Sequence, residues 1–124
     1  MARSGALGTI YQDGEPIVRE GDEGDCMYVI QEGQVEVVTN RNGTEVRLMV
    51  LGEGEPFGEM AIVEKEVRMA TVRAMGQARV LTIDKKSFLR RIHDDPSLAY
   101  RIVQAMSRRV RKLSAQVAQL SGES

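Results

Sequence analysis

The segment CMYVIQEGQVEVVTNRNGTEVRLMVL, residues 26–51, carries the strand pattern that decides the fold class. Three runs of apolar and β-branched residues, at 26–31, 35–39 and 45–51, are separated by glycine or by Asn42-Gly43. An Asn-Gly pair between two such runs favours the two-residue turn of a β-hairpin. The segment therefore predicts antiparallel strands with a tight turn at residues 42–43.

Similar short runs continue on both sides of this segment, at residues 16–19, 67–74 and 79–83, with a short helical segment at 58–63. Many short strands at this spacing indicate a β-sandwich or barrel, here over about residues 9–84. The pattern changes after Asp84, which can cap a helix over residues 85–93. Asp95-Pro96 then predicts the start of a second helix, over residues 96–120. On this pattern, residues 1–124 form one domain.

The last predicted helix is amphipathic, and its second half has heptad-like spacing. It is about 24 residues long, and at 1.5 Å per residue it measures about 36 Å, more than a small barrel can cover. Two interpretations remain open: the stripe packs on the β-domain, or it pairs with a second copy to form a homodimer. The stripe consists of Leu98, Ile102, Met106, Val110, Leu113, Val117 and Leu120.

Composition is that of an ordinary globular protein, with 42% hydrophobic and 28% charged residues and a net charge of −1. No run is apolar enough to span a bilayer, and residues 1–10 lack a signal-peptide core, so we expect no membrane segment in this chain. The single cysteine, Cys26, cannot form an internal disulfide, which favours a cytoplasmic location. The last helix is basic, which can be a solvated face or a nucleic-acid contact. No zinc-finger or helix-turn-helix pattern accompanies it, so no nucleic-acid partner is expected.

Residues that could support catalysis are few, and we predict that the chain is not an enzyme. His93 is the only histidine, and no nucleophile motif accompanies it. Cys26 lies in a strand run, where it packs as a small hydrophobe. One histidine cannot supply a metal cluster, so no metal site or cofactor is expected. The acidic turn GDEGD at residues 21–25 lacks the alternating oxygen ligands of a calcium loop, and GEGEPFG at 52–58 lacks the context of a dinucleotide fingerprint.

The segment FGEMAIVEKEVRMATV, residues 57–72, has the groups that one phosphate and one sugar need. A single helical turn over Glu59–Val63 would present its first main-chain N–H groups to an anion at Gly58, where glycine permits close approach. Arg68 adds a guanidinium suited to bidentate phosphate contact. Glu59, nine positions earlier, would repel a phosphate but can accept a hydrogen bond from a ribose hydroxyl. The alternative is a Glu59–Arg68 salt bridge that only ties the loop.

The chain resembles the cyclic nucleotide-binding domain family, which includes catabolite-activator-type regulators, cyclic-nucleotide-gated channels and cyclic-nucleotide-dependent kinases. The likeness extends from about Gly8 to Leu120. It includes GDEGDCMYVIQEGQVEV and, most specifically, FGEMAIVEKEVRMATVRA, which resembles the phosphate-binding cassette of that family. The resemblance implies a mainly β fold with C-terminal helices (α+β). Its β part would be an eight-stranded antiparallel β-roll, jelly-roll-like, with a short cassette helix and two C-terminal helices.

The resemblance also implies roles for individual residues. Glu59 would bind the ribose 2′-OH and Arg68 the cyclic phosphate. Main-chain groups of Gly58, Met60, Ala61 and Ala70 would complete the cradle, Met49 and Leu51 would contact the purine, and Arg109 and Leu113 would cover the base. Alternation alone leaves open whether Met49 and Leu51 face inward, because Val46, Leu48 and Val50 also read as a core face.

Two positions depart from the usual cassette: Val67 replaces a common proline, and Met69 replaces the small or hydroxyl residue of many relatives. Because methionine has no hydroxyl for guanine or phosphate, we expect cAMP to be preferred over cGMP. The predicted function is a cyclic-nucleotide sensor whose ligand repositions the last helix. The alternative is a degenerate domain that binds no nucleotide and serves as a dimerisation or docking module. The effector stays open: the chain is expected to be an excised module or a minimal protein that signals through a partner.

Overall fold

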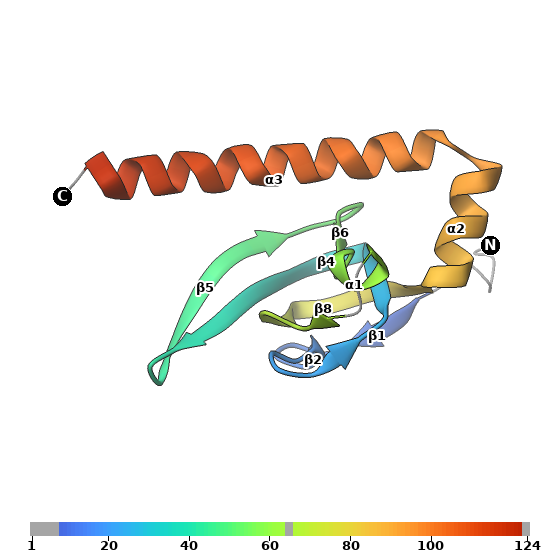
Figure 1. The fold of residues 1–124 in the computed structure, drawn as a ribbon. Coiled ribbons are helices and arrows are strands. Elements are labelled where there is room, and N and C mark those ends of the chain that lie inside the picture. Colours follow the sequence, from blue (N-terminus) through green and yellow to red (C-terminus); the bar gives the residue numbers. More distant parts are fainter. Residues whose placement is uncertain (1–7, 64–65, 123–124) are drawn as a thin grey trace. The chain divides into compact units, whose positions relative to one another are not determined.

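The computed structural model describes residues 8–63 and 66–122. Residues 64 and 65, part of the predicted cassette spacer, lie outside the described residues, as do residues 1–7 and 123–124. The chain divides into two compact units, residues 1–87 and 88–124. The first is mainly antiparallel β and the second is helical (Figure 1), which confirms the mainly β class with C-terminal helices.

The elements of the first unit, with the helix that leads out of it, follow in chain order. They are β1 (Thr9–Tyr11), β2 (Pro16–Val18), β3 (Glu23–Gly24), β4 (Cys26–Arg41), β5 (Thr44–Leu51), β6 (Pro56–Phe57), α1 (Met60–Val63), β7 (Glu66–Val67), β8 (Thr71–Asp84) and α2 (Lys85–Asp94). The second unit contains α3 (Ser97–Gly122).

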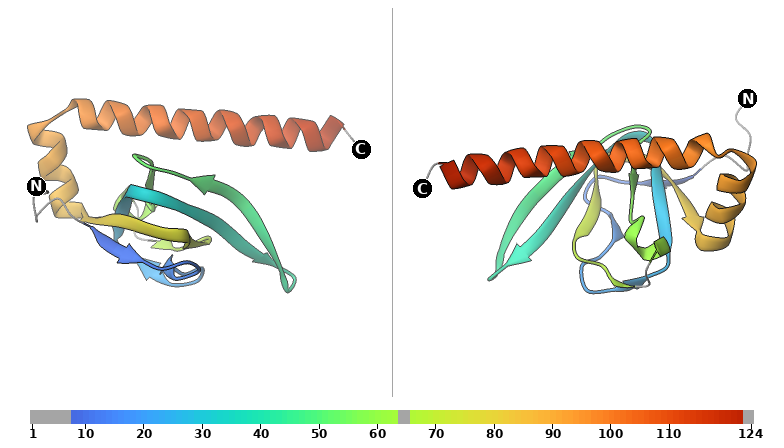
Figure 2. Two further views of the ribbon diagram at one scale, coloured as in Figure 1. Left: turned by 180° about the vertical axis from the view of Figure 1, so that it is seen from behind. Right: turned by 45° about the horizontal axis from the view of Figure 1, so that its top comes forward.

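Two long strands, β4 and β8, organise the sheet. They pair with each other, and β8 also pairs with β1 and β2, while β4 also pairs with β5 and β6. All these pairings are antiparallel. The strands β3 and β7 form a separate two-stranded sheet. The two views in Figure 2 show β1 and β2, in blue, running beside the yellow β8.

The predicted hairpin turn is confirmed. Arg41 pairs with Thr44, which leaves Asn42 and Gly43 as the two turn residues. Both have positive φ, 55° at Asn42 and 83° at Gly43. This conformation is the one that a two-residue turn of type I′ requires and that Asn-Gly adopts readily.

The two predicted strands 26–31 and 35–39 are one strand, β4. Its register against β8 shifts between Ile30 and Glu32 and again between Glu32 and Gln34. Gly33, with φ of 85°, lies inside this irregular stretch. Glycine in a strand often marks a bulge, at which the strand bends without ending. The glycine that predicted a break between two strands therefore marks a bulge within a single strand.

The open question of which face of β5 is inward is resolved. Leu51 is buried in the core and Met49 packs against it, whereas Val46 and Leu48 are exposed. Val37 pairs with Met49 and Val38 with Arg47, so Leu48 is left without a direct partner. Simple alternation could not decide between the two faces, because Met49 and Leu51 on one face and Val46, Leu48 and Val50 on the other are all apolar. The core cluster consists of Ile30, Val35, Leu51, Phe57, Val72, Ala74, Ala78 and Val80.

Both C-terminal helices begin at the predicted caps. The Ser87 N–H donates to Asp84 Oδ1 at 2.7 Å, and the Ser97 N–H donates to Asp95 Oδ1 at 3.2 Å. These carboxylates satisfy main-chain donors that the first turn of a helix leaves unpaired. The second helix begins at Ser97, one residue later than predicted, and continues to Gly122.

Candidate functional site

The main chain of Arg68 is fixed to the turn that follows β2. The Arg68 N–H donates to the Asp22 carbonyl at 2.7 Å, and the Gly21 N–H donates to the Arg68 carbonyl at 2.9 Å. Next to them, Glu23 of β3 pairs with Val67 of β7. The acidic turn at residues 21–25 does not serve as a calcium loop, whose ligands it lacks. It instead fixes the position of the Arg68 main chain.

The Arg68 guanidinium donates hydrogen bonds to two main-chain carbonyls. Its Nη2 lies 2.9 Å from the Cys26 oxygen and its Nη1 lies 3.4 Å from the Gly58 oxygen. Its Cζ lies over the Tyr28 ring, 5.7 Å from the ring centroid. Gly58 stands at the other end of the predicted cassette, so the side chain of Arg68 joins the two ends.

Two glycines make room for this side chain. A β-carbon on Gly24 would clash with the Nε, Cζ and Nη2 atoms of Arg68. A β-carbon on Gly58 would lie 2.9 Å from Arg68 Nη1 and 3.3 Å from Tyr28 Cδ1, and Gly58 has φ of 77°, which favours glycine. The guanidinium can occupy this position because neither residue has a side chain there.

The cassette helix is the single turn α1, which begins at Met60, one residue later than predicted. The Ala61 N–H donates to the Gly58 carbonyl at 3.1 Å, and the Ile62 N–H donates to the Glu59 carbonyl at 3.1 Å. The Ala61 donor is therefore engaged in this structure, and a phosphate would have to share or replace its bond. Glu59 itself is half-buried at the turn before the helix.

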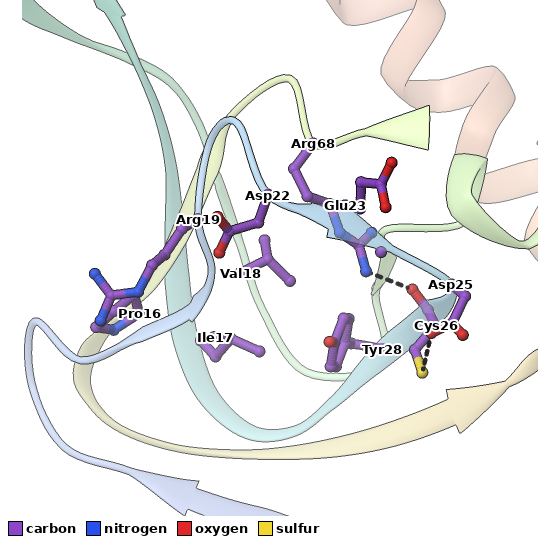
Figure 3. Close-up of a pocket in the computed structure, with 11 residues that line it drawn as sticks. Pro16, Ile17, Val18, Arg19, Asp22, Glu23, Asp25, Cys26, Tyr28 and Arg68 are labelled. Atoms are coloured by element: carbon purple, nitrogen blue, oxygen red, sulfur yellow. Dashed lines mark hydrogen bonds between the residues drawn. The ribbon is translucent and has the colours of Figure 1, made fainter. Parts of the chain in front are cut away.

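A cavity of about 230 Å³ adjoins the Arg68 side chain. In Figure 3 the guanidinium reaches into it toward Cys26, above Tyr28. Ile17 and Val18 supply an apolar wall, and the rest of the lining is largely charged. The lining residues are Pro16, Ile17, Val18, Arg19, Asp22, Glu23, Gly24, Asp25, Cys26, Tyr28 and Arg68.

Two groups in this cavity stay neutral near pH 7. Burial raises the pKa of the Cys26 thiol, and a hydrogen bond to Asp25 raises it further. Burial likewise raises the pKa of Tyr28, against a smaller opposite effect of the Arg68 charge. Neither the thiol nor the phenol therefore neutralises the guanidinium. The ion pairs that the described residues form do not include Arg68.

The remaining candidate residues are placed as follows. Met69 is 80% exposed, and Ala70, half-buried, follows it at the bend before β8. Met49 and Leu51 pack in the core, and neither they nor Glu59 line the cavity beside Arg68. Arg109 and Leu113 lie one turn apart on α3. Their roles toward a ligand stay predictions.

Three parts of the Arg68 environment were missed from the sequence: Gly24, the Tyr28 ring and the Cys26 carbonyl. A main-chain acceptor leaves no signal in a sequence. Gly24 did leave a signal, because a second glycine in a five-residue acidic turn indicates close approach as well as a bend.

Within the described ranges, no group of His, Cys, Asp and Glu side chains could hold a metal ion. No helix in those ranges is both long and apolar enough to cross a membrane.

Comparison with known proteins identifies the family. The profile of the cyclic nucleotide-binding domain matches residues 9–95, which include both ends of the cassette. The chain belongs to this family. The resemblance seen in the cassette sequence is thereby confirmed.

The relatives of this cyclic nucleotide-binding domain include proteins named for different nucleotides. A cyclic AMP receptor protein of Thermus thermophilus is 31% identical over 115 residues, 92% of this chain and 53% of that protein. A cGMP-dependent protein kinase of Caenorhabditis elegans is 43% identical over 91 residues, 71% of this chain and 12% of the kinase. The crystal structure of a T. thermophilus catabolite activator protein matches with a TM-score of 0.77 and 31% identity, over 91% of this chain and 54% of that one. The chain spans about half or less of the length of these relatives.

Proposed function

We propose that this domain binds a cyclic nucleotide, cAMP in preference to cGMP, and acts as a regulatory sensor rather than a catalyst. The observation that carries the proposal is the Arg68 guanidinium, which points into a cavity while bonded to the Gly58 carbonyl. Within residues 8–63 and 66–122, the hydrogen bonds given for Arg68 go to neutral carbonyls, which a planar cation can exchange for the anionic oxygens of a cyclic phosphate. Hydrogen bonds between charged groups are the stronger ones.

The size of the cavity supports a partial site for the nucleotide. At about 230 Å³ it is smaller than the ~300–1,000 Å³ usual for small-molecule pockets. Of the proposed phosphate ligands only Arg68 lines it, so the cavity would hold no more than the part of the phosphate that meets the guanidinium. In the proposal, Glu59 accepts a hydrogen bond from the ribose 2′-OH, and main-chain groups of Gly58, Met60, Ala61 and Ala70 complete the cradle.

The base is assigned to the remaining candidates. Met49 would contact the purine from β5, with the core residue Leu51 supporting it, and Arg109 and Leu113 would cover the base from α3. Met69 offers no hydroxyl to guanine, which supports the preference for cAMP. A ligand that contacts α3 in only one of its positions shifts the helix toward that position. Amide hydrogen exchange across residues 97–120, with and without cAMP, tests this step, and equal protection in the two states would contradict it.

A homodimer through α3 is the partner that we propose besides the nucleotide. The observation that favours it is a row of exposed apolar residues on this helix, taken up in the Discussion.

Calorimetric titration of the nucleotide-stripped domain with cAMP, and separately with cGMP, tests the proposed function. Stripping is necessary because such a site can retain nucleotide from the expression host. Binding of cAMP at micromolar concentrations or tighter, with weaker binding of cGMP, would support the sensor. A folded, ligand-free domain that takes up neither nucleotide would contradict it and favour the docking alternative.

A further inference from the structure

We propose that Tyr28 is a positioning residue for nucleotide binding, whose aromatic face holds the Arg68 guanidinium in the orientation that receives the phosphate. The inference rests on the proposed function, since it concerns the same arginine. It assigns a role to a side chain that neither the cassette pattern nor simple strand alternation singles out.

The Tyr28 ring is itself held by the core. It stacks on the Phe57 ring, with the centroids 5.0 Å apart and the planes inclined by 15°. The two residues are directly paired across β4 and β6, and Phe57 is buried in the main core cluster. An aromatic ring has only two side-chain torsions, so this stack fixes its face with little loss of conformational entropy.

The open face of that ring meets the cation. The Arg68 Cζ is 5.7 Å from the Tyr28 centroid, within the ~6 Å over which a guanidinium is attracted by the ring quadrupole. Gly58 borders the same ring, since a β-carbon there would lie 3.3 Å from Tyr28 Cδ1. The ring, the Cys26 carbonyl and the Gly58 carbonyl thus restrain the guanidinium on three sides.

The physical consequence is preorganisation. A free arginine side chain has several rotatable bonds. A ligand that has to order them binds more weakly, because the side chain loses conformational entropy on binding. The ring restrains the guanidinium without neutralising it, because a π face carries no net charge. A carboxylate in the same place would hold Arg68 equally well but would compete with the phosphate.

The test uses graded changes of the ring on the whole chain. Tyr28→Phe keeps the face, and phenylalanines carrying one to five fluorines at position 28 keep the shape while weakening the quadrupole stepwise. We expect Tyr28→Phe to bind cAMP within about twofold of the wild type. The fluorinated series and Tyr28→Leu should lose affinity progressively, by about threefold to thirtyfold at the end of the series. Val80→Ala, a core change away from the site, controls for lost stability.

The outcomes separate this inference from the proposed function. If the wild type binds cAMP and the fluorinated series is flat, Tyr28 only packs and the inference is overturned. If the wild type binds no cyclic nucleotide, the proposed function fails. The NMR resonance of Arg68 Nε–H in the ligand-free protein then still tests the contact, because a ring face shifts it upfield. A shift unchanged in Tyr28→Leu would overturn the inference in that case as well.

Discussion

Gly24 and Arg68 are in direct contact, and the three atoms nearest to a β-carbon built on Gly24 all belong to the Arg68 side chain. The backbone of Gly24 is not among those with positive φ, so an L-residue is sterically permitted there apart from this contact. The Arg68 guanidinium therefore occupies the space that a side chain at position 24 would fill. The absence of a side chain at Gly24, in β3, therefore matters to the site more than to the strand.

Gly24→Ala should consequently impair binding and spare the fold. The new methyl group displaces the end of a flexible side chain, so the free energy of unfolding should change by less than about 1 kcal/mol. The displaced guanidinium loses a charge-assisted hydrogen bond to the phosphate, and affinity for cAMP should fall by about tenfold or more. Calorimetry and urea denaturation measure the two effects. Gly52→Ala is the matched control, since Gly52 has no atom within 4 Å of its β-position.

Arg68→Ala removes the cation itself. Hydrogen bonds to charged groups contribute about 1.5–3 kcal/mol, so affinity for cAMP should fall by about tenfold to a hundredfold. Arg41→Ala, at an exposed position at the end of β4, should bind normally. Competition against a fluorescent cAMP analogue resolves both affinities. An Arg68→Ala variant that binds as tightly as the wild type would show that the phosphate lies elsewhere.

The strand pattern and the caps were predictable because their causes are local. The turn at Asn42-Gly43 follows from two residues that tolerate positive φ, and the helix starts follow from Asp84 and Asp95. The bulges in β4 and β5 were not predictable, because they depend on pairing with distant strands. That is why β4 was predicted as two strands. The inward face of β5 was left open for another reason, because both of its faces carry apolar residues.

The residues of the candidate site likewise fall into a predictable group and an unpredictable group. Arg68, Glu59 and Gly58 were identifiable because their chemistry suits a phosphate and a ribose and because their spacing matches a known cassette. The Cys26 carbonyl and the ring of Tyr28 were not, since nothing in a single sequence tells which main-chain oxygen or which ring meets a given arginine. Those contacts come from β4 and belong to tertiary structure alone.

Acid should weaken one cross-strand network. Glu36 on β4 accepts hydrogen bonds from Arg73 at 2.7 Å and from Arg47 at 3.0 Å, and the Arg73 bond is the main reason that the pKa of Glu36 is lowered from 4.5. A lowered native pKa stabilises the fold fully above about pH 4.5. This stabilisation is lost as the pH falls below that value and through the native pKa.

Glu36→Gln should therefore lower the free energy of unfolding at pH 7 by about 1 kcal/mol, near the upper end for partly exposed ion pairs. The difference from wild type should shrink as the pH falls below about 4.5 and through the lowered native pKa of Glu36, because the carboxyl is then protonated in both states. Urea denaturation at pH 7, 5 and 3 gives the comparison, and Glu53→Gln, at an exposed turn, is the control. A difference that is constant with pH would mean that charge on Glu36 has no part in it.

The exposed apolar row on α3 predicts a self-associating helix. Val103, Val110 and Val117 recur every seven residues and are 62%, 63% and 61% exposed. Leu113 and Leu120 are also exposed and lie at the intervening positions that complete a heptad seam.

Val110→Glu should weaken the dimer by about a hundredfold or more, because each dimer loses two buried valines at about 1.5 kcal/mol each and gains two charges in the seam. Ala115→Glu adds the same charge outside the seam and should leave the dimer intact. Sedimentation equilibrium measures both variants, and a wild-type chain that is monomeric at every accessible concentration, with or without cAMP, would contradict the seam.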